Sequence, residues 1–186
     1  MKQAQDSFIF NKIKGTDFKT LLLNEIESTI QFLFGYLPGT VGFVIRRFAY
    51  GIFFKSTKGM FWIQPRVIIV NSKNISIGRN FAVNSGTYIN GLGGIDIGDY
   101  VLLGSNITIS AGKHPIEGRE KSVFERPSIP KKIVIEDDVW IGAGCVIMPG
   151  ITLKKGTVIG ANSTVTKDTE EYSINVGSPA RKIGYR

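Results

Sequence analysis

The chain has 186 residues, one cysteine, one histidine and a formal net charge of +8 at pH 7. This length allows one domain with a hydrophobic core and excludes two large domains. The lone Cys145 excludes an internal disulfide, and the lone His114 excludes any site that needs two or three imidazoles from one chain, including a zinc site built on histidines. The charge favours an acidic partner, but no Lys/Arg run exceeds two residues, so we expect no nucleic-acid binding.

The N-terminal third is rich in Leu and Phe and predicts a helical hairpin at residues 1–64. Leu37-Pro38-Gly39 is the turn signal, and the second helix carries Arg46 and Arg47. Glu25, Glu27 and Gln31 interrupt the first helix, which falls short of the ~20 apolar residues that a transmembrane span requires. The apolar face packs on the rest of the chain or on a sister subunit, or it rests on an anionic membrane surface. Residues 1–6 begin no secretory signal, and with one cysteine a cytoplasmic protein is the simpler expectation.

The second half repeats an aliphatic residue every six positions, in three series separated by breaks. The positions are Ile77, Val83, Ile89, Ile97, Leu103, Ile109, Ile135, Ile141, Ile147, Leu153, Ile159 and Val165. A period of six matches neither the 3.6 of a helix nor the 2 of a half-buried strand, so each hexad is predicted to be a short strand followed by a turn.

The other hexad positions support a coiled chain. The residue after each aliphatic position is often Gly or Asn, as at Gly78 and Asn84, which we interpret as left-handed corner dihedrals. Three positions further on the residue is small or β-branched, as at Thr87, Cys145 and Ser163. Three hexads per turn, stacked at the ~4.8 Å strand spacing, would place both kinds of side chain inside a narrow prism. The sequence therefore predicts an all-β fold, a parallel β-helix.

Four segments resemble the hexapeptide-repeat acyltransferases. They are Val139-Trp140-Ile141-Gly142-Ala143-Gly144, Val158-Ile159-Gly160-Ala161-Asn162-Ser163, Val165-Thr166-Lys167-Asp168 and Gly177-Ser178-Pro179-Ala180-Arg181. The resemblance covers roughly residues 75–186 and implies a single-stranded left-handed β-helix. We expect the hairpin at 1–64, the β-helix at 65–170 with an inserted loop at 110–132, and a C-terminal extension at 171–186.

The inserted loop carries the candidate catalytic residue. His114 lies at its base in a segment that resembles the catalytic histidine segment of the family. The resemblance implies acyl transfer from a thioester, for which a neutral imidazole can act as general base toward an alcohol or an amine. Backbone N–H groups at Gly142 or Ala143 are candidates to stabilise the oxyanion. Cys145 is at an inward position and is interpreted as a core residue rather than a nucleophile.

Further site residues are implied by the resemblance. Asn84 would contact the acceptor or serve corner geometry alone, and Trp140 would line the groove for the pantetheine arm or pack on the surface. The resemblance implies no metal and acetyl-CoA as the donor. The backbone at Ala143 and Ala161, with Thr166 and Lys167, would hold the pantetheine arm. Arg181 or Lys182 would meet the nucleotide phosphates.

The sequence favours an acetyl-CoA-dependent O-acetyltransferase acting on a sugar of a surface polysaccharide, such as capsule, O-antigen or exopolysaccharide, or on its precursor. The acidic N-terminal segment of the maltose and galactoside acetyltransferases is not recognisable, which disfavours a free sugar. The alternatives are N-acetylation of an amino sugar or nucleotide sugar, and a non-catalytic β-helix scaffold. The resemblance also implies a homotrimer, and the hairpin suggests peripheral contact with the inner face of the membrane.

Overall fold

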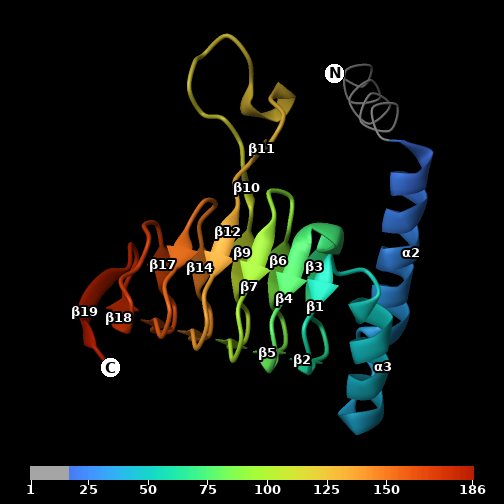
Figure 1. The fold of residues 1–186 in the computed structure, drawn as a ribbon. Coiled ribbons are helices and arrows are strands. Elements are labelled where there is room, and N and C mark those ends of the chain that lie inside the picture. Colours follow the sequence, from blue (N-terminus) through green and yellow to red (C-terminus); the bar gives the residue numbers. More distant parts are fainter. Residues whose placement is uncertain (1–16) are drawn as a thin grey trace.

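The computed structural model describes residues 17–186, and in Figure 1 these form a three-sided β-helix with two helices packed at its N-terminal end. The predicted all-β parallel β-helix with an N-terminal helical hairpin is confirmed. Residues 1–6, in which the sequence shows no secretory signal, lie outside the described range.

Three sheets of mainly parallel strands form the sides of the prism, and we name them A, B and C in the order in which the chain visits them. Sheet A contains β1 (Ser56–Thr57), β4 (Ile75–Ile77), β7 (Ile95–Ile97), β12 (Ile133–Ile135) and β15 (Thr152–Leu153). Sheet B contains β2 (Phe61–Ile63), β5 (Phe81–Val83), β8 (Leu102–Leu103), β13 (Trp140–Ile141), β16 (Val158–Ile159), β18 (Ser173–Val176) and β19 (Arg181–Tyr185). Sheet C contains β3 (Ile68–Val70), β6 (Tyr88–Asn90), β9 (Thr108–Ser110), β14 (Val146–Ile147) and β17 (Thr164–Val165).

The hexad positions form the core. All twelve aliphatic residues of the repeat are buried, and the parallel register stacks them directly: Ile97 pairs with Ile77 on one side and with Ile135 on the other. The compact positions Thr87, Cys145 and Ser163 are buried as well. Other positions four residues after a repeat aliphatic carry larger buried side chains, such as Phe81 and Ile107, so compact and large residues share the interior of the prism.

The interpretation of the glycines that follow the aliphatic positions was wrong. Left-handed backbone occurs two residues later, as at Asn80 (φ 56°) and Gly144 (φ 72°). The earlier glycines are required because successive corners stack closely: a Cβ on Gly78 would lie 2.3 Å from the carbonyl oxygen of Gly98. No side chain fits between two backbones at that distance, so the hexad glycine serves close approach rather than an unusual dihedral.

The β-helix begins earlier than the repeat suggests, because β1, β2 and β3 form a complete coil before β4. Its aliphatic residues Ile63 and Ile69 are buried and six positions apart. A short 3₁₀ turn, Ser72–Asn74, then shifts the phase before Ile75. This shift hides the first coil from a count that starts at Ile77.

The hairpin consists of α2 (Phe18–Phe34) and α3 (Gly39–Gly51), as the Leu37-Pro38-Gly39 signal predicts. Asp17 caps α2 by accepting a hydrogen bond from the Thr20 amide at 2.9 Å, and Gly39 takes a left-handed φ of 67° at the turn. Gln31 holds α2 against the free edge of β3, since its side chain donates to the Ile69 carbonyl at 2.6 Å and accepts from the Ile69 amide at 2.9 Å. Within residues 17–186 no helix has the length and apolar character needed to cross a membrane.

Candidate active site

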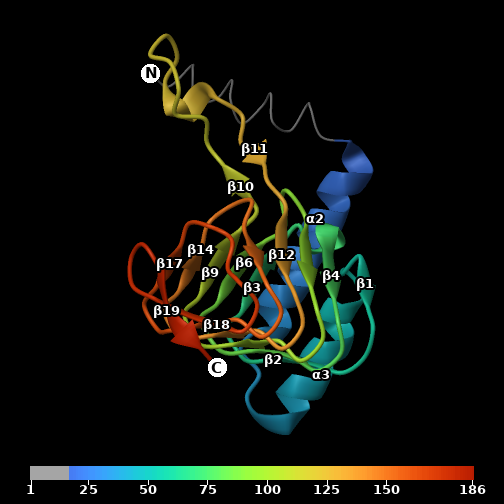
Figure 2. The same ribbon diagram turned by 60° about the vertical axis from the view of Figure 1, so that its left-hand side comes forward.

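The inserted loop leaves the prism at the corner between sheets C and A. It begins and ends in a short antiparallel pair, β10 (Gly112–Lys113) with β11 (Ile129–Pro130), and it projects well beyond the prism in Figures 1 and 2. Arg126 organises the outer part, because its guanidinium donates to the carbonyls of Gly118 at 3.0 Å and Lys121 at 2.7 Å, and also to that of Glu117. The loop is therefore tied internally by an arginine rather than by a hydrophobic core.

His114 directly follows β10 and is exposed. Its Nε2 lies 3.4 Å from Oγ of Ser128, which is the side-chain partner of this imidazole within residues 17–186. The antiparallel register pairs Lys113 with Ile129, and one further step on each strand brings His114 opposite Ser128. Sequence reasoning missed Ser128, although a predicted antiparallel pairing of the two loop ends would have found it.

Asn84 lies at a different corner of the prism, between sheets B and C. It follows β5, is half-buried, and its backbone amide donates to the Leu103 carbonyl at 3.0 Å. Strand β6 and the whole width of sheet C separate this corner from the one that carries His114. Six extended residues span up to roughly 20 Å. A single chain therefore does not bring Asn84 and His114 together.

Ala143 and Ala161 lie at the same corner as Asn84, on later coils. They belong to successive turns, because the Asn162 amide donates to the Ala143 carbonyl at 2.8 Å. The expectation that Gly142 offers a free amide was wrong, since its N–H donates to the Ile159 carbonyl at 2.8 Å. The Ala143 amide makes no backbone hydrogen bond in the described part of the chain, which leaves it available for an oxyanion.

Trp140 points outward from sheet B, where it is 51% exposed. It lies in β13 and pairs with Leu102 of β8 and Val158 of β16. Leu102 is also exposed, so the outer surface of this sheet carries an apolar row that leads to the corner of Ala143. This position makes the indole accessible to an elongated ligand that lies along the sheet.

The cationic residues expected to meet the donor lie at the C-terminal end. A cavity of about 170 Å³ is lined by Lys167, Arg181 and Lys182, together with Asp168 and Glu170. The structure thus brings the three predicted cations to one place, whereas Thr166 lies next to Lys167 but outside the lining of this cavity.

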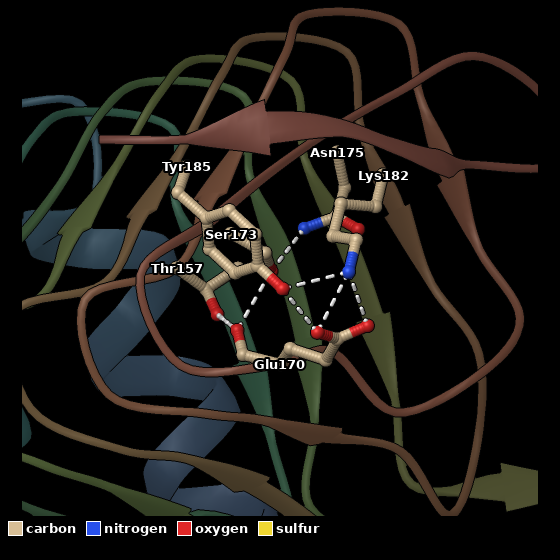
Figure 3. Close-up of polar contacts among 6 residues, drawn as sticks. All are labelled: Thr157, Glu170, Ser173, Asn175, Lys182 and Tyr185. Carbon is tan, nitrogen blue, oxygen red and sulfur yellow. Dashed lines mark hydrogen bonds and ion pairs between the residues drawn. The ribbon is translucent and has the colours of Figure 1, made fainter.

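The three cations differ in the charge that surrounds them. Figure 3 shows Lys182 facing Glu170 and Tyr185: its Nζ lies 2.6 and 2.7 Å from the two carboxylate oxygens and 2.8 Å from the phenol oxygen. These hydrogen bonds raise the pKa of Lys182 and lower that of Glu170. Arg181 donates to the carbonyl of Ala180 and has no carboxylate partner among the described residues. Arg181 therefore offers an anion more uncompensated charge than Lys182 does.

A polar network closes the prism beneath these residues, as Figure 3 shows. Ser173 Oγ donates to the Glu170 carbonyl at 2.6 Å and accepts from Asn175 at 2.8 Å, and Thr157 Oγ1 donates to the same carbonyl at 3.2 Å. Thr157 and Ser173 are fully buried. Paired polar groups thus terminate the core where the apolar repeat ends.

Comparison with known proteins identifies the relatives of this chain. Residues 132–167 match the family described as bacterial transferase hexapeptide (six repeats). A galactoside O-acetyltransferase of Escherichia coli (strain K12) is 40% identical over 122 residues, which are 66% of this chain and 59% of that protein. A dTDP-4-amino-4,6-dideoxy-D-glucose acyltransferase of Escherichia coli is 31% identical over 160 residues, covering 72% of this chain and 83% of that protein.

A solved structure of a known protein has the same fold as this chain. It is a hexapeptide-repeat containing acetyltransferase from Vibrio cholerae O1 biovar eltor complexed with acetyl coenzyme A, with a TM-score of 0.80 and 28% identity over 92% of this chain and 91% of that chain. The present chain matches about three fifths of the length of the galactoside O-acetyltransferase. The similarity confirms the left-handed β-helix, and the chain belongs to the hexapeptide-repeat acyltransferases.

Proposed function

We propose that the chain is an acetyl-CoA-dependent O-acetyltransferase that acts on a sugar of a surface polysaccharide, such as capsule, O-antigen or exopolysaccharide, or on its precursor. The observation that carries this proposal is the exposed His114 imidazole at the neck of the inserted loop, at one edge of sheet C. The opposite edge of the same sheet carries Asn84 and the unpaired Ala143 amide.

In the proposed reaction His114 is the general base. Its imidazole takes the proton of the acceptor hydroxyl while the oxygen attacks the thioester carbonyl, and the Ala143 amide donates to the resulting oxyanion. Collapse of the tetrahedral intermediate breaks the C–S bond, and the imidazolium returns the proton to the departing sulfur. Asn84 would orient the acceptor. Because Cys145 is fully buried and burial raises the pKa of its thiol, it has no part in this sequence.

The site requires a second subunit. Since His114 and Asn84 occupy opposite edges of sheet C, a cyclic homotrimer that turns this sheet toward its axis would set the His114 edge of one subunit beside the Asn84 edge of the next. The loop that projects beyond the prism in Figure 2 would contact the neighbouring subunit in such a trimer. This arrangement would complete three equivalent sites, each between two prisms.

The donor would lie along the outer surface of sheet B toward the C-terminal end. Trp140 would line the groove for the pantetheine arm, and the corners at Ala143 and Ala161, with Thr166 and Lys167, would hold that arm. The nucleotide phosphates would reach the cavity of about 170 Å³, where Arg181 has no carboxylate partner in the described chain. A guanidinium that is free of carboxylates suits phosphate. We assign Lys182 the weaker role because Glu170 neutralises it.

A groove next to the acceptor corner supports an acceptor with an apolar part. Its volume is about 420 Å³, and it runs between α2 and β3, lined by Phe32, Ile68 and Val70. Arg66 and Gly86 also line this groove, and Gly86 lies two residues from Asn84 in the chain. A lipid-linked sugar phosphate would present its apolar chain to Phe32, Ile68 and Val70 and its phosphate to Arg66. Such precursors agree with a cytoplasmic location at the inner face of the membrane, in peripheral contact through the hairpin.

Transfer of labelled acetyl from acetyl-CoA to lipid-linked sugar acceptors tests the proposal, with His114→Asn as the inactive control. Hydroxylamine distinguishes O-acetylation from N-acetylation, since it cleaves the ester of an O-acetyl product and spares an amide. N-acetylation of an amino sugar is the second candidate, favoured by the 31% identity to the dTDP-4-amino-4,6-dideoxy-D-glucose acyltransferase. Absence of coenzyme A binding in calorimetry would favour the non-catalytic scaffold instead.

A further inference from the structure

The apolar stripe of the α3 helix faces away from the rest of the protein, whereas a helix that only packs on its own protein turns this stripe toward the core. Its buried residues are Gly42, Arg46 and Tyr50, two of which carry polar groups. Its outward stripe consists of Val41, Val44, Phe48 and Ile52, which are 72%, 43%, 69% and 73% exposed. A surface helix of a globular protein normally shows the opposite arrangement. The outward stripe therefore contributes nothing to the core and is available to a partner.

Arg46 fixes this orientation. It is 1% exposed, and its guanidinium donates to the carbonyls of Ile63 at 2.9 Å, Leu37 at 2.5 Å and Phe34 at 3.4 Å. These contacts reach β2, the helix turn and the end of α2. A rotation of α3 that buried Phe48 would expose Arg46 and leave these three carbonyls without their donor, which is costly. The exposed stripe is thus locked outward.

The α2 helix repeats the pattern. Its inward face carries the polar Glu27 and Gln31 beside Ile30, which packs against the core, and Gln31 pairs with both backbone groups of Ile69. Its outward residues include Phe18, Leu22, Ile26, Phe32, Leu33 and Tyr36, all of them exposed. Contiguous exposed apolar patches are unusual on monomeric proteins and mark sites of interaction with a protein or a membrane. Two helices with the same inversion indicate a surface built for an apolar environment.

The charges around these stripes identify the environment. The five ion pairs of the described chain all lie from Arg79 onward, in the β-helix and its C-terminal end. Four basic residues of the hairpin and of the segment that follows it have no ion pair within residues 17–186, Lys19, Arg47, Lys55 and Lys58, against two exposed carboxylates there, Asp17 and Glu25. Exposed apolar stripes with an excess of cations that lack a carboxylate partner are typical of helices that lie in the plane of an anionic membrane surface.

We infer that the outward stripes of α2 and α3 dock on an anionic lipid bilayer, with both helices in the plane of the interface and the prism directed into the aqueous phase. The helices cross the N-terminal end of the prism in Figure 1, whereas the proposed trimer packs the prism sides, so trimer formation would leave them uncovered. The inference deepens the proposed membrane contact by naming its residues and lipid charge, and it rests on the proposed function for its purpose only.

Vesicle flotation of the full chain tests the inference. Vesicles of phosphatidylcholine mixed with phosphatidylglycerol should carry the protein to the top of the gradient, with binding about tenfold weaker on phosphatidylcholine alone and weaker at high salt. The double variant Phe48→Ser/Ile52→Ser should lose at least about tenfold in binding. Ile183→Ser is the matched control, because Ile183 is 67% exposed at the opposite end of the prism. Equal thermal melting of the variants would show that they fold.

Two results would overturn the inference: no binding of the wild-type chain to anionic vesicles, or unchanged binding of the double variant. A third is self-association of the wild-type chain through this face, seen in sedimentation and lost in the double variant, which would assign the stripes to a second copy. Acetyl transfer to the lipid-linked sugar acceptors is measured in parallel, in detergent micelles without vesicles. Transfer without vesicle binding sinks the inference alone, and vesicle binding without transfer sinks the proposed function alone.

Discussion

Oγ of Ser128 lies 3.4 Å from Nε2 of His114, one residue beyond the last paired positions of β10 and β11. The imidazole is thereby held at the neck of the inserted loop by the antiparallel pair itself, while its remaining surface stays open to solvent.

Replacing His114 by Asn should lower the turnover of acetyl transfer about 10²- to 10⁴-fold, since a positioned general base contributes that much. The side chain is exposed, so the melting temperature and the affinity for coenzyme A should not change. Steady-state kinetics and calorimetry measure these quantities. Ser128→Ala is the matched variant. A loss of turnover below about tenfold in this variant would show that the Ser128 hydroxyl positions the imidazole ring and is not itself the general base. Near-normal turnover of the Asn variant would refute the base assignment.

Arg181 and Lys182 should behave differently although they are neighbours. Arg181→Ala removes a cation without a carboxylate partner and should raise the KM for acetyl-CoA about tenfold, as expected for a lost charge-assisted hydrogen bond to phosphate. Lys182→Ala removes a cation that Glu170 already neutralises, so its KM should change much less. Repeating the kinetics with dephospho-coenzyme A esters would test which phosphate is involved. Equal effects of both substitutions would contradict the assignment.

Cys145 should be chemically silent in the folded protein. It is fully buried, its Sγ donates to the Gly160 carbonyl at 3.1 Å, and burial raises the pKa of the thiol. A thiol reagent should therefore react only after denaturant is added, because the thiolate is the reactive form. Cys145→Ala should retain acetyl transfer within about twofold and cost about 1 kcal/mol of stability. Loss of transfer in a folded Ala variant would reinstate a covalent mechanism.

Arg46 should matter to stability more than any exposed arginine. Arg46→Met removes the donor of three carbonyls, including Ile63 O at 2.9 Å, and should lower the free energy of unfolding by about 3–5 kcal/mol. Arg47→Met is the control, because Arg47 is only half-buried and donates to the single carbonyl of Gly59 at 3.2 Å. Chemical denaturation measures the difference. Similar losses in both variants would show that Arg46 does not lock α3.

Glu27 predicts a pH-dependent effect of opposite sign to that of the surface carboxylates. Burial raises its pKa above the ordinary value of 4.5, against smaller lowering contributions from Ser72 and Lys73. Folding therefore disfavours the ionised form: the penalty is absent below pH 4.5, grows as the pH rises above 4.5, and is fully present above the raised folded-state pKa. Glu27→Gln should stabilise the protein at pH 8 and lose this advantage at pH 4. A constant difference in denaturation midpoints across this range would contradict the assignment.

The sequence alone determined the prism, because twelve aliphatic residues recur every six positions within three series and all twelve are buried in the three-sided coil. It also marked the insertion and His114, since a break in a strict repeat is visible without coordinates. The first coil escaped the count because the 3₁₀ turn at Ser72–Asn74 shifts the phase before Ile75.

Tertiary structure decided everything that depends on which residues meet across the coil. Only the packed chain places Ser128 beside His114, neutralises Lys182 with Glu170 but not Arg181, and engages the Gly142 amide. Tertiary packing also turned the apolar stripe of α3 outward. The buried Arg46 donates hydrogen bonds to three carbonyls, whereas Phe48 in its place would have no group to donate. The spacing of hydrophobic residues is visible along the sequence. Hydrogen bonds and charge compensation join residues that are distant in the sequence, so only the folded chain reveals them.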